Sequence, residues 1–251
     1  MPVKLFFLDW WFAKQDLGMT YCSKLFVVYG PALAGIIVTA VTSGKAGLSI
    51  FFARLKPNFR QAVWWVVLPV AGTLITALAC IIAGISPYSL FTIVINNLPL
   101  WGLHLVLATL IIGFGEEMGW RGYLWPELLK TRKVRLAIPI MFVVWGLWHF
   151  PLLFNGYKFV IPFLILELSA TVILAWIWQR VNGNIFVLAI AHGSIDFSEF
   201  FFEKQVLGSG QHWDYILTMW GVLSLLYAAV AIVIVLVPAT KKDLFGDKGS
   251  K

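Results

Sequence analysis

Three clusters of ionisable and aromatic residues lie within or beside apolar stretches of this 251-residue chain. Their members are Glu116, Glu117 and Arg121, then Trp145 and His149, and finally His192 and Asp196. A charged side chain at the centre of a membrane-spanning helix costs roughly 2.5–3.5 kcal/mol on insertion scales. Such residues persist where they pair with one another or take part in chemistry, so the clusters predict a functional site.

Helical spacing separates the two glutamates of the first cluster. Glu117 and Arg121 are four positions apart with the glutamate first, which is the favourable order for an ion pair on a helix. Glu116 lies about 100° around the helix from Glu117, given about 3.6 residues per turn. Arg121 can therefore neutralise Glu117 while Glu116 faces the interior of the helical bundle. The alternative explanation is that all three residues form a network of ion pairs inside the membrane with a purely structural role.

The second and third clusters have the same helical spacing. Trp145 and His149 are four positions apart, as are His192 and Asp196, and Glu199 lies about one turn further on. An interhelical hydrogen bond or a hydrated helix face near the membrane surface would explain either cluster alone. Their coincidence on separate spans favours a common site.

Glutamate and histidine side chains together can activate water for hydrolysis. Glu116 and His149 can bind and deprotonate a water molecule. His192 and Asp196 can then stabilise the oxyanion that forms when this water attacks a carbonyl. The sequence has no Gly-x-Ser-x-Gly motif, and neither cysteine has a histidine nearby in sequence, so no covalent nucleophile is indicated.

A metal site is an alternative that the same residues allow. Glu116, His149 and His192 are ligand types that suit zinc, although the His-Glu-x-x-His motif of many zinc proteases does not occur. The two cysteines, Cys22 and Cys80, lie in apolar runs and are interpreted as buried apolar residues.

Composition places these clusters in a membrane protein. Hydrophobic residues make up 60% of the chain, charged residues 12%, and the mean hydropathy is +0.86, whereas soluble domains contain about 25% charged residues. We expect an all-α, polytopic transmembrane helical bundle with a polar catalytic cavity, forming a single membrane domain over residues 1–251. The net charge of +7 comes from basic residues between apolar spans and does not indicate nucleic acid.

Apolar runs of about 20 residues predict about seven spans. The predicted spans cover residues 25–42, 62–85, 98–114, 136–154, 160–181, from 185 onward, and 215–237. The third is expected to continue as a helix through the acidic cluster to Leu129. Residues 44–60 are expected to form a basic cytoplasmic loop, and residues 90–97 an uncharged connection.

Three further segments complete the predicted organisation. Residues 1–20 form an interfacial N-terminal segment, residues 98–202 the motif-bearing core, and residues 238–251 a cytoplasmic tail. Most lysines and arginines fall in the loops after the first, third and fifth spans or in the tail. The positive-inside rule then predicts a cytoplasmic C-terminus.

The three clusters, in the same order, resemble the motifs of the CAAX protease and bacteriocin-processing (CPBP) family of intramembrane proteases. Glu116-Glu-Met-Gly-Trp-Arg121 resembles the family's Glu-Glu-x-x-x-Arg signature. Trp145-Gly-Leu-Trp-His149 resembles Phe-x-x-x-His, and His192-Gly-Ser-Ile-Asp196 resembles His-x-x-x-Asn. The motif-bearing resemblance covers residues 113–199.

The resemblance implies an intramembrane glutamic endopeptidase similar to type II CAAX prenyl proteases, in a prokaryotic cell membrane. The implied catalytic residues are Glu116 as the base, His149 as its partner, and His192 and Asp196 at the oxyanion. The implied supporting residues are Glu117, Arg121 and Trp145. Implied partners are membrane lipid and CAAX-like or other membrane-associated peptides, and no cofactor is implied.

Two departures from the family motifs bear on mechanism. Trp145 replaces phenylalanine, and Asp196 stands where the family often has asparagine. An ionised aspartate would repel an oxyanion, so Asp196 is either protonated, orients His192, or contributes to a metal site. The family often has eight spans, which suggests a shortened N-terminal region.

Three alternative functions follow from the same residues. The chain is a zinc-dependent membrane protease, a non-catalytic bacteriocin-immunity protein, or a proton-coupled transporter, since intramembrane carboxylates and histidines also build proton relays. Glu167 and His104 match no motif and are interpreted as interhelical hydrogen-bonding residues.

Overall fold

The computed structural model describes residues 17–154, 156–207 and 213–246, and these contain helices and turns but no strand. Six helical stretches are long and apolar enough to cross a membrane. These stretches are Lys24–Ala53, Phe59–Ile82, Leu98–Thr131, Tyr157–Arg180, Ile185–Phe202 and Tyr215–Leu236. The prediction of an all-α polytopic membrane bundle is therefore confirmed.

The predicted fourth span is shorter than expected. Helix α9, Val134–Trp148, has 15 residues, fewer than the roughly 20 needed to cross a bilayer. The 3₁₀ segment η4, Phe150–Phe154, follows it. The predicted seven spans thus correspond, among the described residues, to six long helices and this short apolar one.

The N-terminal part of the described chain forms α2, Leu17–Val28, and α3, Gly30–Ala53. The chain bends at Gly44, where φ is +60°, a conformation that glycine adopts without steric cost. The helix resumes after the bend, so the prediction of a loop from residue 44 was wrong as far as residue 53. The resumed helix buries Phe51 against Ile185 and Met118, and this packing outweighs the nearby basic residues.

The next elements are η1, Phe59–Gln61, α4, Ala62–Ile82, and α5, Pro87–Asn96. Helix α5 corrects the predicted uncharged connection. Pro87 occupies its first turn, where the missing N–H costs nothing and the fixed φ favours a helix.

The predicted continuation of the third span through the acidic cluster is confirmed, and two π-helical segments interrupt it. The order is α6, Leu98–Leu107, η2, Ala108–Gly113, α7, Phe114–Gly119, η3, Trp120–Leu124, and α8, Trp125–Thr131. The π segments η2 and η3 lie on either side of α7, which carries both glutamates. Such interruptions occur often at functional sites.

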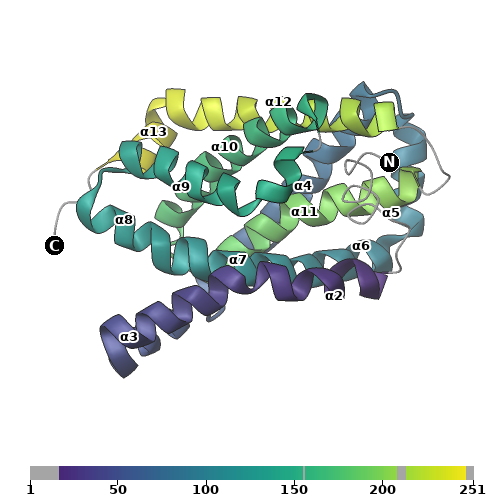
Figure 1. Ribbon diagram of the computed structural model, residues 1–251. Helices are drawn as coiled ribbons and strands as arrows, with labels where there is room; N and C mark the ends of the chain where they lie inside the picture. The colour runs from purple at the N-terminus through teal and green to yellow at the C-terminus, as the bar shows by residue number, and fades with distance from the viewer. Residues whose placement is uncertain (1–16, 155, 208–212, 247–251) are drawn as a thin grey trace.

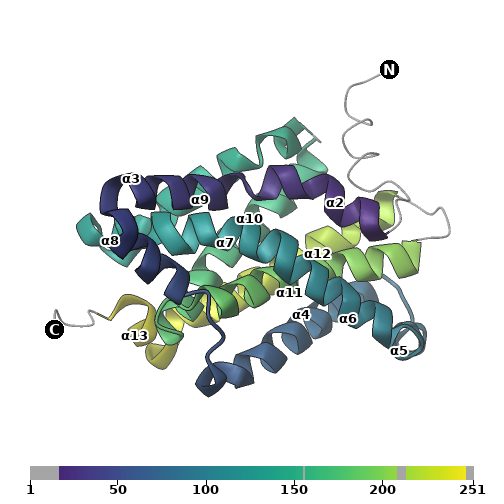
Figure 2. The same cartoon turned by 90° about the horizontal axis from the view of Figure 1, so that it is seen from below.

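Two glycines on this helix allow close backbone contacts. A side chain at Gly113 would collide with the carbonyl oxygen of Ala189, and one at Gly119 with that of Pro31. The acidic helix is therefore pressed between α3 and a later helix, α11, Ile185–Leu207. Figures 1 and 2 both show α7 running beside α3 and α11.

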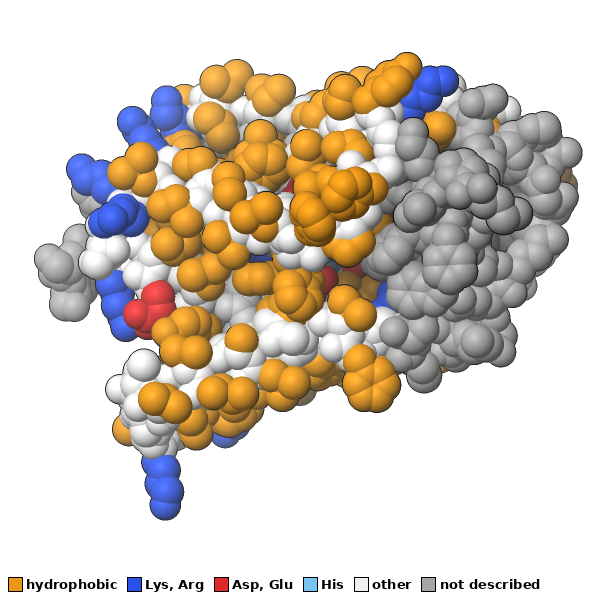
Figure 3. Space-filling view, in the orientation of Figure 1, with side chains coloured by type: hydrophobic (Ala, Val, Ile, Leu, Met, Phe, Trp, Pro, Cys, Tyr) orange, Lys and Arg blue, Asp and Glu red, His pale blue; other side chains and the backbone are white. Residues whose placement is uncertain are grey.

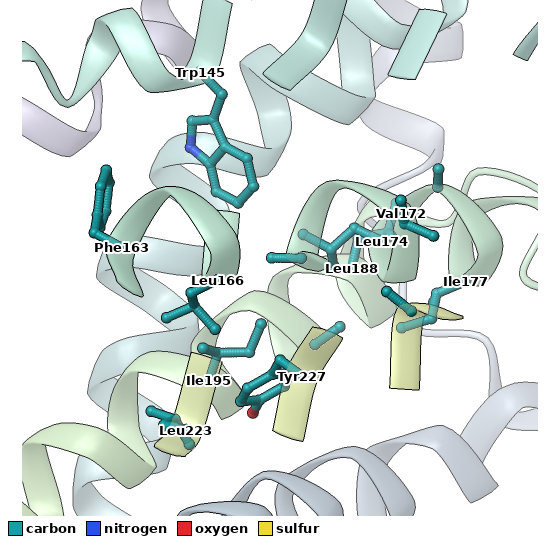
Figure 4. Close-up of a cluster of buried hydrophobic side chains, with 14 of the residues drawn as sticks. Trp145, Phe163, Leu166, Val172, Leu174, Ile177, Leu188, Ile195, Leu223 and Tyr227 are labelled. Carbon is teal, nitrogen blue, oxygen red and sulfur yellow. The ribbon is translucent and has the colours of Figure 1, made fainter. Parts of the chain in front are cut away.

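Helix α11 is the central helix of the bundle, and 83% of the residues in its apolar stretch are buried. It contacts α4, α6, η2, α7 and α10, Tyr157–Arg180. Helix α12, Trp213–Leu236, packs along α10 and α4, and α13, Pro238–Phe245, turns back onto both α10 and α12. Figure 4 shows part of the resulting core, in which Leu166, Ile195 and Leu223 lie together.

The outer surface matches a lipid environment. Large apolar side chains are exposed on many helices, including Phe26 at 90% and Val41 at 81%. Figure 3 shows hydrophobic side chains across the middle of the face drawn, with basic side chains gathered mostly toward its left edge. This arrangement is typical of a multi-pass integral membrane protein, whose basic residues lie beyond the hydrocarbon region.

Candidate active site

Glu116 is held by two tryptophans. Its Oε2 accepts hydrogen bonds from Trp120 Nε1 at 3.0 Å and from Trp145 Nε1 at 2.8 Å. Trp120 lies one turn away on the same helical run, whereas Trp145 reaches across from α9. Both bonds end on Oε2, so the carboxylate is oriented while Oε1 remains available to a water molecule. The whole residue is only 3% exposed.

Glu117 points to a different set of partners. Its Oε1 accepts a hydrogen bond from the Arg121 guanidinium at 2.7 Å and contacts His192 Nδ1 at 2.8 Å. The Arg121 guanidinium also lies 4.3 Å from the centre of the Trp145 ring. The predicted ion pair between Glu117 and Arg121 is therefore present, and it reaches a second helix through His192.

His149 lies at the C-terminal end of α9, where its Nδ1 has two neighbours. The backbone oxygen of Trp145 is 3.1 Å away and Oε1 of Glu167 is 3.4 Å away. A carbonyl oxygen can only accept, so Nδ1 carries the hydrogen and donates it. In the neutral ring Nε2 is then the unprotonated nitrogen, able to accept a proton or a hydrogen bond.

His192 lies between two carboxylates. Its Nδ1 contacts Glu117, and its Nε2 lies 3.7 Å from Oδ2 of Asp196. The second distance is too long for a hydrogen bond. Asp196 therefore makes no hydrogen bond with His192 at this distance, and Nε2 remains available to another partner.

These side chains surround one cavity of about 90 Å³. Its polar lining residues are Lys24, Glu116, His149, Glu167, His192, Asp196 and Glu199. Apolar side chains, including Phe163, Ile195 and Trp220, form most of the remaining wall. In Figure 3, a few acidic and basic side chains can be seen behind hydrophobic ones near the centre of the face drawn. The cavity thus places polar groups within a largely apolar wall.

The structure brings the sequence-predicted residues together in two layers. The residues in contact with the cavity are Glu116, Trp145, His149, His192 and Asp196. Glu117 and Arg121 lie behind this wall, with exposed fractions of 0% and 1%. The helical-phase argument predicted this separation of the two glutamates correctly.

Two cavity residues were not expected from the sequence. Glu167 was interpreted as a plain interhelical hydrogen-bonding residue, and Lys24 was not among the candidate site residues. Lys24 lies instead in the cavity wall, 3.7 Å above the centre of the Phe200 ring. A buried acid inside an otherwise apolar span was the only sequence signal for Glu167, and Lys24 gave none because it stands at the edge of a span.

The donor arrangement does not match the zinc site considered from the sequence. Among the described residues no group of three or more His, Cys, Asp or Glu side chains is arranged to hold a metal ion. Glu116, His149 and His192 therefore form no ready metal centre.

Comparison with known proteins identifies the same region of the chain. Residues 98–198 match the family model described as "Type II CAAX prenyl endopeptidase Rce1-like". The chain is also 29% identical over 153 residues to a protein of Methanococcus maripaludis named CAAX prenyl protease 2. That alignment covers 57% of this chain and 52% of the relative, so the chain spans about half the length of the protein that it matches.

Proposed function

We propose that this chain, which belongs to the Rce1-like family of type II CAAX prenyl endopeptidases, is an intramembrane endopeptidase that uses water as its nucleophile. The observation that carries the proposal is the arrangement of Glu116. Two indole N–H groups hold one of its oxygens, and the residue lines the same cavity as His149 and His192. This is the geometry of an oriented general base beside two histidines.

The reaction begins with a water molecule between Glu116 and His149. Oε1 of Glu116 takes a proton from this water as the water oxygen bonds to the peptide carbonyl carbon. The carbonyl π electrons move onto the oxygen, which becomes an oxyanion. When the intermediate collapses, the C–N bond breaks and the leaving nitrogen takes the proton from Glu116, which restores the carboxylate.

His149 and His192 have different tasks in this scheme. His149 accepts a hydrogen bond from the water through Nε2, because its Nδ1–H is directed at Trp145. His192, when protonated, donates its Nε2–H to the oxyanion while Glu117 holds Nδ1. Asp196, when ionised, stabilises the charged His192 ring from 3.7 Å, which is a role through charge and not the orienting role considered from the sequence.

The substrate that fits this cavity is a peptide held at the membrane. The polar groups lie within a largely apolar wall, which suits a chain presented from the lipid phase. We therefore propose CAAX-like, prenylated or otherwise membrane-associated peptides as substrates. We also propose that the protein lies in a prokaryotic cell membrane, as its relative from Methanococcus maripaludis suggests. The basic loops support a cytoplasmic C-terminus.

The test of this function uses the purified full chain in liposomes. A farnesylated peptide ending in a CAAX sequence and the same peptide without the lipid are incubated with it, and products are identified by mass spectrometry. We expect one internal cut in the farnesylated peptide and slower cleavage of the unlipidated one. Equal absence of cleavage with both peptides, and with a library of membrane-anchored peptides, would contradict the proposal.

A metal chelator distinguishes this mechanism from a zinc protease. Treating the protein with 1,10-phenanthroline and then removing the chelator is expected to leave the cleavage rate unchanged. The reason is that Glu116 itself takes the proton from water, so no metal-bound hydroxide is required. Loss of activity on chelation, restored by added zinc, would show that the histidines bind a metal after all.

Replacing Trp145 by phenylalanine tests the support of Glu116. Phenylalanine keeps an aromatic ring but removes the N–H that donates to Oε2 at 2.8 Å. A hydrogen bond to a charged group contributes about 1.5–3 kcal/mol, so we expect kcat to fall by roughly 10- to 100-fold. Trp101→Phe is the matched control, because it also removes an indole hydrogen bond, here to Thr73, and Trp101 lies outside the cavity wall. An equal effect of both substitutions would contradict a specific role for the Trp145 indole.

A further inference from the structure

Glu167 is a buried acid that the proposed mechanism does not use. It lies within α10, whose apolar stretch has a mean hydropathy of 2.2, and its exposed fraction is 4%. No motif includes it. A carboxylate in such a place is costly unless a specific partner stabilises it, so its surroundings indicate what it does.

The partner that faces Glu167 is His149. Oε1 of Glu167 lies 3.4 Å from Nδ1, the same nitrogen that contacts the backbone oxygen of Trp145. The ring also lies against Phe163, whose centre is 5.3 Å away in an edge-on arrangement, and against the Trp145 ring at 6.0 Å. Nδ1 thus points at the backbone oxygen of Trp145 with the Glu167 carboxylate at ion-pair distance beside it, and the opposite nitrogen is directed away from both.

The backbone of α9 leaves room for this carboxylate. A Cβ atom at Gly146 would lie 3.3 Å from Oε2 of Glu167, closer than side chains normally approach. Gly146 stands between Trp145 and His149 in sequence, so the space lies beside the site. The absence of a side chain at Gly146 therefore leaves room for the Glu167 carboxylate where α10 packs against α9.

The pairing repeats an arrangement on the other side of the cavity. There Glu117 contacts Nδ1 of His192. Here Glu167 lies beside Nδ1 of His149 at the longer distance of 3.4 Å. In metal sites and catalytic triads, a carboxylate on one ring nitrogen orients the imidazole and favours proton binding at the other. Each histidine of the site thus has its own carboxylate.

We propose that Glu167 is a positioning residue that holds His149 with Nε2 toward the water and stabilises the ring when it carries a proton. The inference rests on the proposed endopeptidase function, because it assigns Glu167 to the water-binding side of that site. Glu167 acts through His149 and needs no contact with the substrate.

The first test compares three variants in α10. Glu167→Gln removes the charge at constant size and is expected to lower kcat by roughly 10- to 100-fold, as for other residues that orient a catalytic histidine, while KM stays the same. Glu167→Asp keeps the charge and is expected to recover part of kcat. The matched control is Thr171→Val, one turn further along α10, which removes a hydroxyl bonded only to the backbone oxygen of Glu167 and leaves kcat unchanged.

A substitution in α9 tests the same contact without changing the acid. Gly146→Ala is expected to displace the carboxylate and lower kcat, but to cost nothing further in a Glu167→Gln background. Such non-additivity shows that both changes act on one interaction. Additive losses would mean that Gly146→Ala disturbs α9 by itself, and would count against the inference.

A chemical readout decides the inference even if no substrate is cleaved. Diethylpyrocarbonate modifies unprotonated imidazole, and mass spectrometry locates the modification on individual histidines. Because a nearby carboxylate stabilises the protonated ring, Glu167→Gln is expected to speed modification of His149 and leave His192 unaffected. Glu167→Asp repeats the measurement if the glutamine variant does not fold.

The outcomes separate this inference from the proposed function. Wild-type cleavage, together with unchanged kcat and unchanged His149 labelling in Glu167→Gln, would overturn the role of Glu167 and leave the endopeptidase intact. Faster His149 labelling without any wild-type cleavage would support the pairing and refute the proposed reaction. A loss of folding in Glu167→Asp as well as Glu167→Gln, with unaltered His149 labelling in folded Gly146→Ala, would show a purely structural role.

Discussion

Glu116→Gln is expected to abolish peptide cleavage while the protein remains folded. A glutamine amide cannot take a proton from water, and general-base catalysis contributes roughly 10²- to 10⁴-fold to such reactions. The amide oxygen can still accept the indole N–H groups of Trp120 and Trp145, so the local packing survives. The measurement is kcat on the farnesylated peptide, together with the elution profile of the variant in detergent.

The matched control for this substitution is Glu127→Gln. Glu127 follows Glu116 along the same helical run but pairs with Lys130 at the surface, with 40% of its side chain exposed. It is expected to keep full activity. Retained cleavage by purified Glu116→Gln would refute the assignment of Glu116 as the general base.

Two measurements test the alternative functions. In cells, protection against a bacteriocin that survives Glu116→Gln would indicate a non-catalytic immunity protein. Glu116-dependent ion flux in proteoliposomes would indicate a transporter.

Glu117→Gln is expected to act mainly on stability. Breaking a buried ion pair by removing one partner costs roughly 3–5 kcal/mol, because the remaining charge is left buried without compensation. Here that charge is Arg121, which is 1% exposed. The variant also weakens the contact with His192, so a reduced kcat accompanies the lower stability. The lost stability is measured by thermal or denaturant unfolding of the variant and the wild type in the same detergent.

A second substitution tests the cause of this instability. Removing the orphaned charge in a Glu117→Gln, Arg121→Gln double variant is expected to recover part of the stability. The exposed pair of Glu127 and Lys130 supplies the comparison, since surface ion pairs contribute only about 0–1 kcal/mol. A Glu117→Gln protein that is as stable as wild type but inactive would reverse the roles of the two glutamates.

Local spacing predicted the parts of the site that a single helix can specify. The ion pair of Glu117 and Arg121 follows from their four-residue separation, and the guanidinium nitrogen lies 2.7 Å from the carboxylate oxygen. The different direction of Glu116 follows from the helical phase in the same way. The continuous helix through the acidic cluster was also predictable, because no strong helix breaker interrupts the run before Pro126, which occupies the first turn of α8.

Contacts between helices were beyond the reach of the sequence. The hydrogen bond from Trp145 to Glu116 joins residues 29 positions apart, and it depends on how α9 packs beside α7. The motif comparison treated Trp145 as a replacement for phenylalanine. In the folded protein its indole nitrogen, which phenylalanine lacks, is the atom that donates a hydrogen bond to Glu116.

Packing also decided which unexpected residues join the site. Glu167 has no spacing relationship with His149, and only the approach of α10 to α9 at Gly146 brings them together. Packing also explains why the chain is helical beyond Gly44, because Phe51 is buried there against other helices. Lys24 enters the cavity because α2 lies beside the acidic helix.

By itself, the sequence determined the class of the protein and the chemical groups of its site. Hydropathy specifies membrane helices because water-to-lipid transfer depends on composition alone, and helical periodicity specifies which neighbours on one helix can pair. Tertiary structure decided which helices meet, and so which carboxylate faces which histidine. Those contacts depend on close packing of helices at positions such as Gly113 and Gly146. No local sequence pattern specifies which helix will pack against such a position.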